Sequence, residues 1–416
     1  MIPFFMHKLK SFFNWLGAIL ALWLLLFLIY GWKHTQLMLD FYTGAASTML
    51  KGESPRGVTA MAYPPPLVAA YIPFCEMGDL MQRILALGIM SLLLVFIFAT
   101  LQKKVVGEQT LLSTILFWFL VALTVGRYVT SPIENYSHDI FIAALVILAI
   151  RLWSTRREGQ GGVVMGVAAA CKATPLLFLP FLFLQRRWKA AIVMSVATAA
   201  VFILPDLLFP RSGGTWASYW FSIVTNSLNQ VRGTVKVGNW TDWNQLNQSL
   251  SGTISRIFSY PDKSNADAVS VCIVELQPAT IKKIVFSARI AILGILIWAL
   301  YKPVKTPIVM RRFCEGSLLV CGMLLLSPMS SKAHFFLLVL PATVIIRYYI
   351  WERRDRLILA ILIIMFIYGS LSAKDIIGTK AGHAVLATGS VTWCTLLAML
   401  GTWRVMRLRH SSLDSS

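Results

Sequence analysis

Residues 161–184 read GGVVMGVAAACKATPLLFLPFLFL, an apolar segment with a lysine and a proline near its middle. Basic pairs flank this segment at 156–157 and at 186–187. A single crossing of a bilayer would leave one pair on each side, although basic residues concentrate on the cytoplasmic side. Pro175 disfavours helix at the residue before it and removes a backbone donor. We therefore predict a broken, re-entrant helical hairpin over 161–185, with its turn near this proline.

The whole chain has the composition of a polytopic membrane protein. Of its 416 residues 57% are hydrophobic and only 13% are charged, and the mean hydropathy is +0.69. These values exclude an ordinary soluble domain. The net charge is +20, but the basic residues stand in short clusters between apolar runs. That pattern is typical of cytoplasmic loops that face anionic lipid, so we expect a lipid bilayer as partner and no nucleic acid.

Further apolar runs are long enough to cross a bilayer, which takes roughly 20 residues per helix. They lie near 13–32, 81–101, 111–128, 139–153, 189–209, 281–301, 313–328, 334–351, 357–371 and 383–403. With a cytoplasmic N-terminus and a hairpin that does not cross, the later basic clusters fall on the cytoplasmic side. We predict an all-α, multi-pass protein of the plasma (inner) membrane, with about ten full crossings, cytoplasmic termini and one embedded domain over 1–416.

Two long outer loops follow from this topology, at 33–80 and 211–283. Asp40 stands in the first loop, directly after the first span, where a carboxylate can serve as base on a polar acceptor. A helix N-cap or a simple interfacial charge is the structural alternative. The same loop returns to the membrane through Tyr63-Pro64-Pro65-Pro66, because consecutive prolines impose a stiff, extended backbone.

Two cationic positions suggest an anion site. Lys172 is an ionisable group inside an apolar segment, which is costly and usually functional. Its expected partner is a lipid-linked phosphate, Asp206 or Glu315; a snorkelling or structural lysine is the alternative. His334 begins a span two residues after Lys332, and two neighbouring cations suit a phosphate. A lone interfacial histidine is the alternative for His334.

The second outer loop carries Trp240, Trp243 and Asn247 among several amides. Aromatic rings cover the C–H faces of sugars and amides bond their hydroxyls, so we expect either a sugar-binding surface or an amphipathic loop lying on the membrane. The six cysteines show no metal-ligand spacing. Cys75 and Cys272 fall in outer segments, so the sequence also allows a disulfide between them. No Gly-rich phosphate loop, HExxH or nucleophile elbow is present.

Taken in order, these residues resemble the polyprenol-phosphate-mannose-dependent mannosyltransferases of glycosyltransferase family 87. The matching pieces are Asp40-Phe41-Tyr42, Lys51-Gly52, Tyr63-Pro64-Pro65, Gly166 with Lys172 and Pro175, Arg186-Arg187-Trp188, Asn247-Gln248-Ser249, and Leu326-Ser327-Pro328 with His334. The resemblance covers most of the chain. The chain departs from the family where it has Glu134-Asn135 in place of a Gln and an Asn near a Gly. It also has His334 alone in place of paired histidines with a Trp.

The resemblance implies a GT-C fold and an inverting transfer of a hexose, mannose in this family, from a polyprenyl-phosphate donor. The acceptor would be a hydroxyl of a lipid-linked sugar or glycan on the extracytoplasmic side. Asp40 would act as general base, which requires a pKa raised above its ordinary value of about 4. Since no second carboxylate stands two residues after Asp40, the resemblance implies no metal, and no cofactor besides the donor substrate.

The resemblance also assigns binding roles. Lys172, Lys332 and His334 would bind the phosphate of the donor, and His334 would be catalytic as well. The residues expected to bind the substrate or acceptor are Tyr42, Tyr63, Glu134, Asn135, Trp240, Trp243 and Asn247.

Two other function classes stay open at this point. A transporter of lipid-linked glycans is expected to show inverted repeats or paired broken helices, whereas this chain has one broken segment and no internal repeat. A polysaccharide polymerase or ligase would use outer-loop arginines such as Arg211, Arg232 and Arg256. The sequence does not identify the sugar, the acceptor or the linkage.

Overall fold

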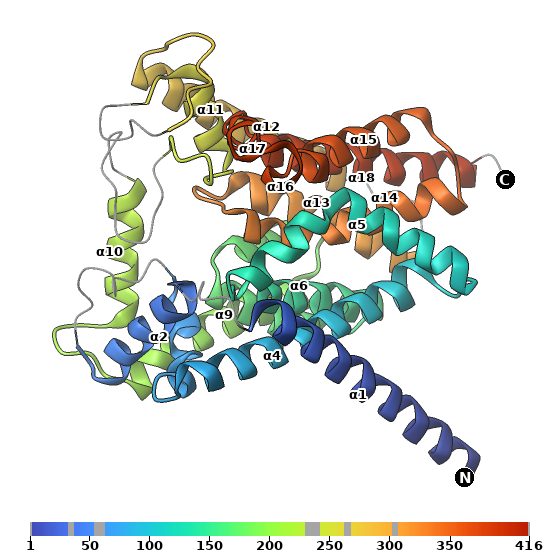
Figure 1. The fold of residues 1–416 in the computed structure, drawn as a ribbon, viewed down its shortest axis with the longest axis horizontal. Helices are drawn as coiled ribbons and strands as arrows, with labels where there is room; N and C mark the ends of the chain where they lie inside the picture. Colours follow the sequence, from blue (N-terminus) through green and yellow to red (C-terminus); the bar gives the residue numbers. More distant parts are fainter. Residues whose placement is uncertain are drawn as a thin grey trace.

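A computed structural model describes residues 2–31, 37–53, 63–228, 242–261, 268–301 and 307–414, and this part of the chain contains helices and no strand (Figure 1). The helices are α1 (Ile2–Tyr30), α2 (Leu37–Leu50), α3 (Pro65–Ala69), α4 (Asp79–Leu101), α5 (Leu111–Glu134), α6 (Asp139–Ser154), α7 (Glu158–Cys171), α8 (Phe178–Leu184), α9 (Trp188–Leu208), α10 (Trp216–Leu228), α11 (Leu250–Phe258), α12 (Pro278–Tyr301), α13 (Ile308–Leu326), α14 (Val339–Trp351), α15 (Arg356–Phe366), α16 (Lys374–Ile377), α17 (Thr379–Ala387) and α18 (Ser390–Asp414). In Figure 1, α2, α10 and α11 gather at one end of the molecule, and the C-terminus lies at the other.

Several apolar helices indicate a membrane-embedded protein, as the composition predicts. Among the described residues, five helical stretches are long and apolar enough to span a bilayer: Asp79–Val106, Leu111–Glu134, Trp188–Leu208, Pro278–Tyr301 and Lys332–Trp351. The pair α17–α18, bent by 55°, makes a sixth if it counts as one span. Four shorter apolar stretches accompany them. The count of about ten crossings and the GT-C fold therefore stay predictions.

The segment that follows α6 is a broken helical pair. α7 ends at Cys171, Lys172 is extended (φ −151°, ψ 117°), and a 3₁₀ turn over Thr174–Leu177 leads into α8. The chain then returns to its starting point, because Arg187 after α8 forms an ion pair with Glu158 at the start of α7, Nη2 to Oε2 2.6 Å. Passage of this pair into and out of a membrane on one side stays a prediction.

Small residues allow α7 and α9 to pack closely. Gly162 faces the backbone of Ala190, and Gly166 faces Met194 and Ala197. Both contacts advance along the two chains in the same direction, so the helices run parallel. The spacing of four between the two glycines is the small-xxx-small pattern that brings helix backbones together in membranes.

Basic residues from several helices meet at the end where α7 begins. Arg187 covers the Trp153 ring, with its guanidinium 4.8 Å from the ring centroid, and Arg312 of α13 donates to Gln185 Oε1 at 3.1 Å. In a separate pair, Arg404 of α18 binds Asp355, the N-cap of α15, at 2.9 Å. These helix ends are the ones that the sequence places in the cytoplasm; the sidedness itself stays a prediction.

The six cysteines are all free thiols in the structure. The Cys75–Cys272 disulfide that the sequence allows is therefore not formed. The Cys75 thiol instead donates to the carbonyl oxygen of Thr43 at 3.3 Å, which holds it against α2. Cys272 lies in the segment after α11. The backbone N–H of its neighbour Ile273 donates to the carbonyl oxygen of Ile257.

Candidate functional site

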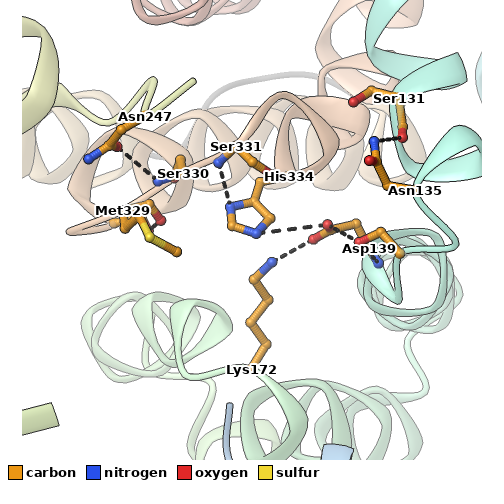
Figure 2. Close-up of polar contacts among 11 residues, drawn as sticks. Ser131, Asn135, Asp139, Lys172, Asn247, Met329, Ser330, Ser331 and His334 are labelled. Carbon is orange, nitrogen blue, oxygen red and sulfur yellow. Dashed lines mark hydrogen bonds and ion pairs between the residues drawn. The ribbon is translucent and has the colours of Figure 1, made fainter. Parts of the chain in front are cut away.

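Two titratable side chains from separate segments converge on the carboxylate of a third residue, Asp139 (Figure 2). Asp139 begins α6, Lys172 follows α7, and His334 lies in the 3₁₀ helix Lys332–Leu338. The Lys172 ammonium lies 2.5 Å from Asp139 Oδ1, and His334 Nε2 lies 3.8 Å from Asp139 Oδ2. We call these residues the Asp139 triad. All three side chains are at least five-sixths buried, so their charges face little solvent.

Neighbouring polar groups hold the triad in place. Ser137 Oγ donates to Asp139 Oδ2 at 2.6 Å. The backbone N–H of Ser331 donates to His334 Nδ1 at 3.2 Å. An Nδ1 that accepts a hydrogen bond assigns the proton of a neutral imidazole to Nε2, which is the nitrogen turned toward Asp139. His334 is thus oriented to donate at the same place as Lys172.

A small cavity opens beside the triad. Its walls are Asp139, Ile142, Lys172, Thr174, Met323, Leu324, Ser327, Ser330, His334 and Leu337. They come from α6, from the turn after α7, from the end of α13 and from the segment that carries His334. Ionisable groups gathered around a cavity inside an apolar helix bundle are expensive, and they usually mark a substrate or ion site. The cavity is therefore the candidate binding site of this protein.

The carboxylate partner of Lys172 is Asp139, and not Asp206 or Glu315 as the sequence suggested. Asp206 accepts hydrogen bonds from the backbone N–H groups of Trp216 and Ala217 and so caps α10. Glu315 is held by Arg311 at 2.7 Å and by Arg312 at 2.6 Å. The choice of Asp139 depends on how α6 packs beside α7, and that packing is not encoded in local sequence.

An aromatic cluster joins the first outer loop to the triad. The Tyr42 ring stacks on Tyr71 with centroids 4.7 Å apart and meets His138 edge-on at 5.3 Å. Tyr63 also meets His138 edge-on, at 4.7 Å. We call Tyr42, Tyr63, Tyr71 and His138 the aromatic cluster. The rings of both predicted tyrosines thus contact His138, the residue that precedes Asp139 in the chain.

His138 is the site residue that sequence reasoning missed. It is 5% exposed, and neither Nδ1 nor Nε2 has a hydrogen-bond partner. The available signal was the run Ser137-His138-Asp139, three polar residues that open an apolar helix. That signal marks a helix start equally well, so it did not single out the histidine.

Asp40 lies in the first turn of α2 and is exposed, whereas Leu39 and Tyr42 of the same helix are buried. Two positions along a helix differ by about 200°, so Asp40 points away from the face that carries Tyr42. Partial burial and the Asp79 carboxylate raise the pKa of Asp40 above its ordinary value, and the Arg83 guanidinium opposes them. The direction is the one that a general base near neutral pH requires.

Lys332 stands two residues before His334 but has other neighbours. The charges that act on it come from Arg127, Lys374, Glu134 and Asp375, whereas those that act on His334 come from Asp139 and Lys172. A joint role of Lys332 and His334 at one phosphate stays a prediction.

The remaining predicted binding residues that the structure describes differ in exposure. Glu134 and Asn135 are exposed at the end of α5, and the Asn135 amide donates to the carbonyl oxygen of Ser131 at 2.7 Å. Trp243 is buried. Asn247 Oδ1 accepts from the backbone N–H of Ser330 at 3.4 Å, so it supports one wall of the cavity. Trp240 lies outside the described residues.

The sequence profile described as Glycosyltransferase family 87 matches residues 62–328, more than half of the chain. The chain belongs to glycosyltransferase family 87. The matched region contains the aromatic cluster from Tyr63 on, together with Asp139 and Lys172, and it ends just before the segment of His334. No curated protein and no solved structure matches the chain.

Membership in family 87 makes this protein a glycosyltransferase. Among the described residues, no group of three or more His, Cys, Asp or Glu side chains is arranged to hold a metal ion. Independence from metals and cofactors stays a prediction.

Proposed function

We propose that this family 87 glycosyltransferase transfers a hexose, most simply mannose, from a polyprenyl-phosphate donor to a hydroxyl of a lipid-linked or glycan acceptor. The transfer takes place on the extracytoplasmic side of the plasma membrane. One observation carries the proposal: Lys172 and His334, 162 positions apart in the sequence, meet at Asp139 beside a cavity within an apolar helix bundle. Two hydrogen-bond donors facing a cavity at that depth suit the phosphate of a lipid carrier.

Each residue has a defined task in the proposed reaction. The acceptor oxygen forms a bond to C1 of the sugar as the bond from C1 to the phosphate oxygen breaks on the opposite face. The electron pair of the broken bond stays on the polyprenyl phosphate. Lys172 and His334 Nε2–H would donate to that phosphate, where charge-assisted bonds are strongest. The proton of the acceptor hydroxyl passes to Asp40.

The role of Asp40 sets a geometric requirement. Because Asp40 is on the exposed face of α2, the acceptor must approach from that side, while the donor phosphate lies at the Asp139 triad. Tyr42 of the aromatic cluster belongs to the same helix as Asp40 and contacts His138, next to Asp139, so the sugar would lie along the aromatic cluster. The raised pKa of Asp40 supports its use as a base.

A sugar-transfer assay tests the proposal. Purified wild type, Asp40→Asn and Glu76→Gln would each receive radiolabelled polyprenyl-phosphate mannose and a membrane lipid extract from the source organism. Glu76 is an exposed carboxylate of the same outer segment and serves as the matched control. Loss of a general base lowers kcat by about 10²–10⁴-fold, so we expect labelled product with wild type and Glu76→Gln only.

Other outcomes discriminate among the alternatives. Equal transfer by wild type and Asp40→Asn would remove Asp40 from the chemistry and leave the reaction class standing. Donor binding without transfer would point to another sugar or acceptor. No donor binding by any protein would overturn polyprenyl-phosphate mannose as the donor.

A further inference from the structure

His138 stands out among the buried polar groups of the described structure. Buried nitrogen and oxygen atoms are nearly always hydrogen-bonded, because leaving one unsatisfied destabilises the fold. Both imidazole nitrogens of His138 lack a partner, and the Tyr42 ring, whose hydroxyl interacts with the Tyr63 side chain, lies 5.3 Å away. Two unsatisfied nitrogens on one buried side chain indicate a place where another molecule supplies the hydrogen bonds.

The position of His138 specifies which part of a substrate it meets. It precedes Asp139, whose carboxylate holds Lys172 at 2.5 Å, and the charges that act on it are those of Asp139, Lys172 and His334. A phosphate bound by Lys172 would thus bring the group attached to it next to His138. Resting on the proposed function, that group is the sugar of the donor.

The chemistry of the aromatic cluster fits a neutral sugar better than a second anion. A neutral imidazole has one donor and one acceptor, and a tyrosine hydroxyl can do both, which matches the hydroxyl groups of a hexose. The rings of Tyr42 and Tyr63 lie edge-on to His138 and supply apolar surface for the C–H face of a sugar ring. Among these four side chains none carries a fixed positive charge for a phosphate.

We infer that His138, together with the Tyr42 hydroxyl, binds the hydroxyl groups of the donor hexose and so contributes to the choice of sugar. The residue touches substrate in this assignment, separately from the phosphate contacts of Lys172 and His334. The aromatic cluster then selects the sugar, and the triad retains the lipid phosphate.

A binding experiment with two probes separates these contributions. Full-length wild type, His138→Phe, Tyr42→Phe and His383→Phe in lipid nanodiscs would be titrated with polyprenyl-phosphate mannose and with polyprenyl phosphate that carries no sugar. Phenylalanine keeps the size and aromatic packing at each position but removes the polar atoms. His383 lies on α17, which contributes no residue to the cavity walls or to the aromatic cluster, and is the matched control.

We expect His138→Phe to weaken binding of polyprenyl-phosphate mannose by roughly ten-fold or more, since a pocket that bonds hydroxyls loses affinity when a partner is removed. Its affinity for polyprenyl phosphate should stay within about two-fold of wild type, as should both affinities of His383→Phe. Tyr42→Phe should act in the same direction as His138→Phe, and His138→Gln, which keeps a donor and an acceptor, should restore part of the loss.

The results that would contradict the inference differ from those that would contradict the proposed function. If wild type binds both probes and His138→Phe weakens both equally, or neither, the inference falls while the proposed function stands. If wild type binds neither probe, the proposed function falls and the inference falls with it. If His138→Phe unfolds at a lower temperature than His383→Phe, the test rests on Tyr42→Phe: weaker binding of polyprenyl-phosphate mannose alone supports the inference, and unchanged or equally weakened binding of both probes opposes it.

Discussion

At the scale of single residues, the ion pair of Lys172 and Asp139 is the most consequential contact. Taking two charges out of water is costly, so such a pair adds little net stability, whereas removal of one partner leaves a buried charge without compensation. An apolar pair of similar size would serve the fold equally well. The pair is therefore better explained by a ligand that competes with Asp139 for the Lys172 ammonium.

This explanation predicts a separation of stability from activity. Lys172→Met should lower the free energy of unfolding by about 3–5 kcal/mol, because the buried Asp139 carboxylate loses its lysine partner. The double variant Lys172→Met/Asp139→Asn should recover most of that loss yet remain inactive in sugar transfer. Thermal unfolding in detergent and the transfer assay measure the two properties. A double variant no more stable than Lys172→Met would mean that the pair does not form.

The pH dependence of transfer tests Asp40 as the base. Activity requires ionised Asp40, so the rate rises with pH through its pKa, which burial and Asp79 raise. The acid limb of the profile of kcat/KM should thus lie above the ordinary Asp value of about 4. Asp79→Asn should move that limb to lower pH, and Arg83→Gln to higher pH. A limb that neither variant moves would exclude Asp40 as the titrating group.

At the scale of the elements, the contact between α7 and α9 positions the break that presents Lys172. A Cβ at Gly166 would lie 2.7 Å from Ala197 Cβ and 2.8 Å from the carbonyl oxygen of Met194, and backbone atoms cannot yield as a flexible side chain does. The two helices can approach only where glycine leaves room. The end of α7, and with it the reach of Lys172 to Asp139, depends on this approach.

Gly166→Ala should therefore destabilise the protein, by about 1–3 kcal/mol, through overpacking. Gly294→Ala on α12 is the matched control, since no heavy atom lies within 4 Å of its added Cβ. In a helix interior that change should be neutral or stabilising by up to about 1 kcal/mol. Thermal unfolding of both variants gives the comparison. Equal effects at the two glycines would show that α7 and α9 do not pack as described.

The elements also show what the sequence can and cannot predict. The break after α7 was predictable because its causes are local: Pro175 and the basic pairs at both ends. The partner of Lys172 was not, since Asp139 reaches it only when α6 and α7 pack side by side. His138 was missed for the same reason, because only the surrounding tyrosine rings distinguish it from an ordinary residue at a helix start.

At the scale of the whole molecule, the membrane topology depends on whether the pair α7–α8 crosses the bilayer once or returns to the side from which it entered. If the pair α7–α8 enters and leaves on one side, the chain after it keeps its orientation, and residues 211–283 lie outside. If the pair crosses once, every later loop inverts. The ion pair of Arg187 with Glu158 at 2.6 Å favours the first arrangement, because it joins the end of α8 to the start of α7.

The number of crossings is harder to predict, since α6 and α15 are shorter than a full span and α13 carries three charges in its first half.

Labelling of two exposed loop positions determines whether α7–α8 crosses the membrane. Glu108, between α4 and α5, should lie in the cytoplasm, and Glu275, before α12, should lie outside; both side chains are exposed. Glu108→Cys and Glu275→Cys would be made in a background in which Cys75 and Cys272, the two cysteines that are not buried, are replaced by serine. A membrane-impermeant maleimide applied to intact cells should label Glu275→Cys at once and Glu108→Cys only after permeabilisation. Labelling of neither position in intact cells would mean that α7–α8 crosses once, and would place the loop 211–283 on the cytoplasmic side, away from an extracytoplasmic donor. Labelling of Glu108→Cys alone would mean that the predicted cytoplasmic and extracytoplasmic sides are exchanged throughout the chain.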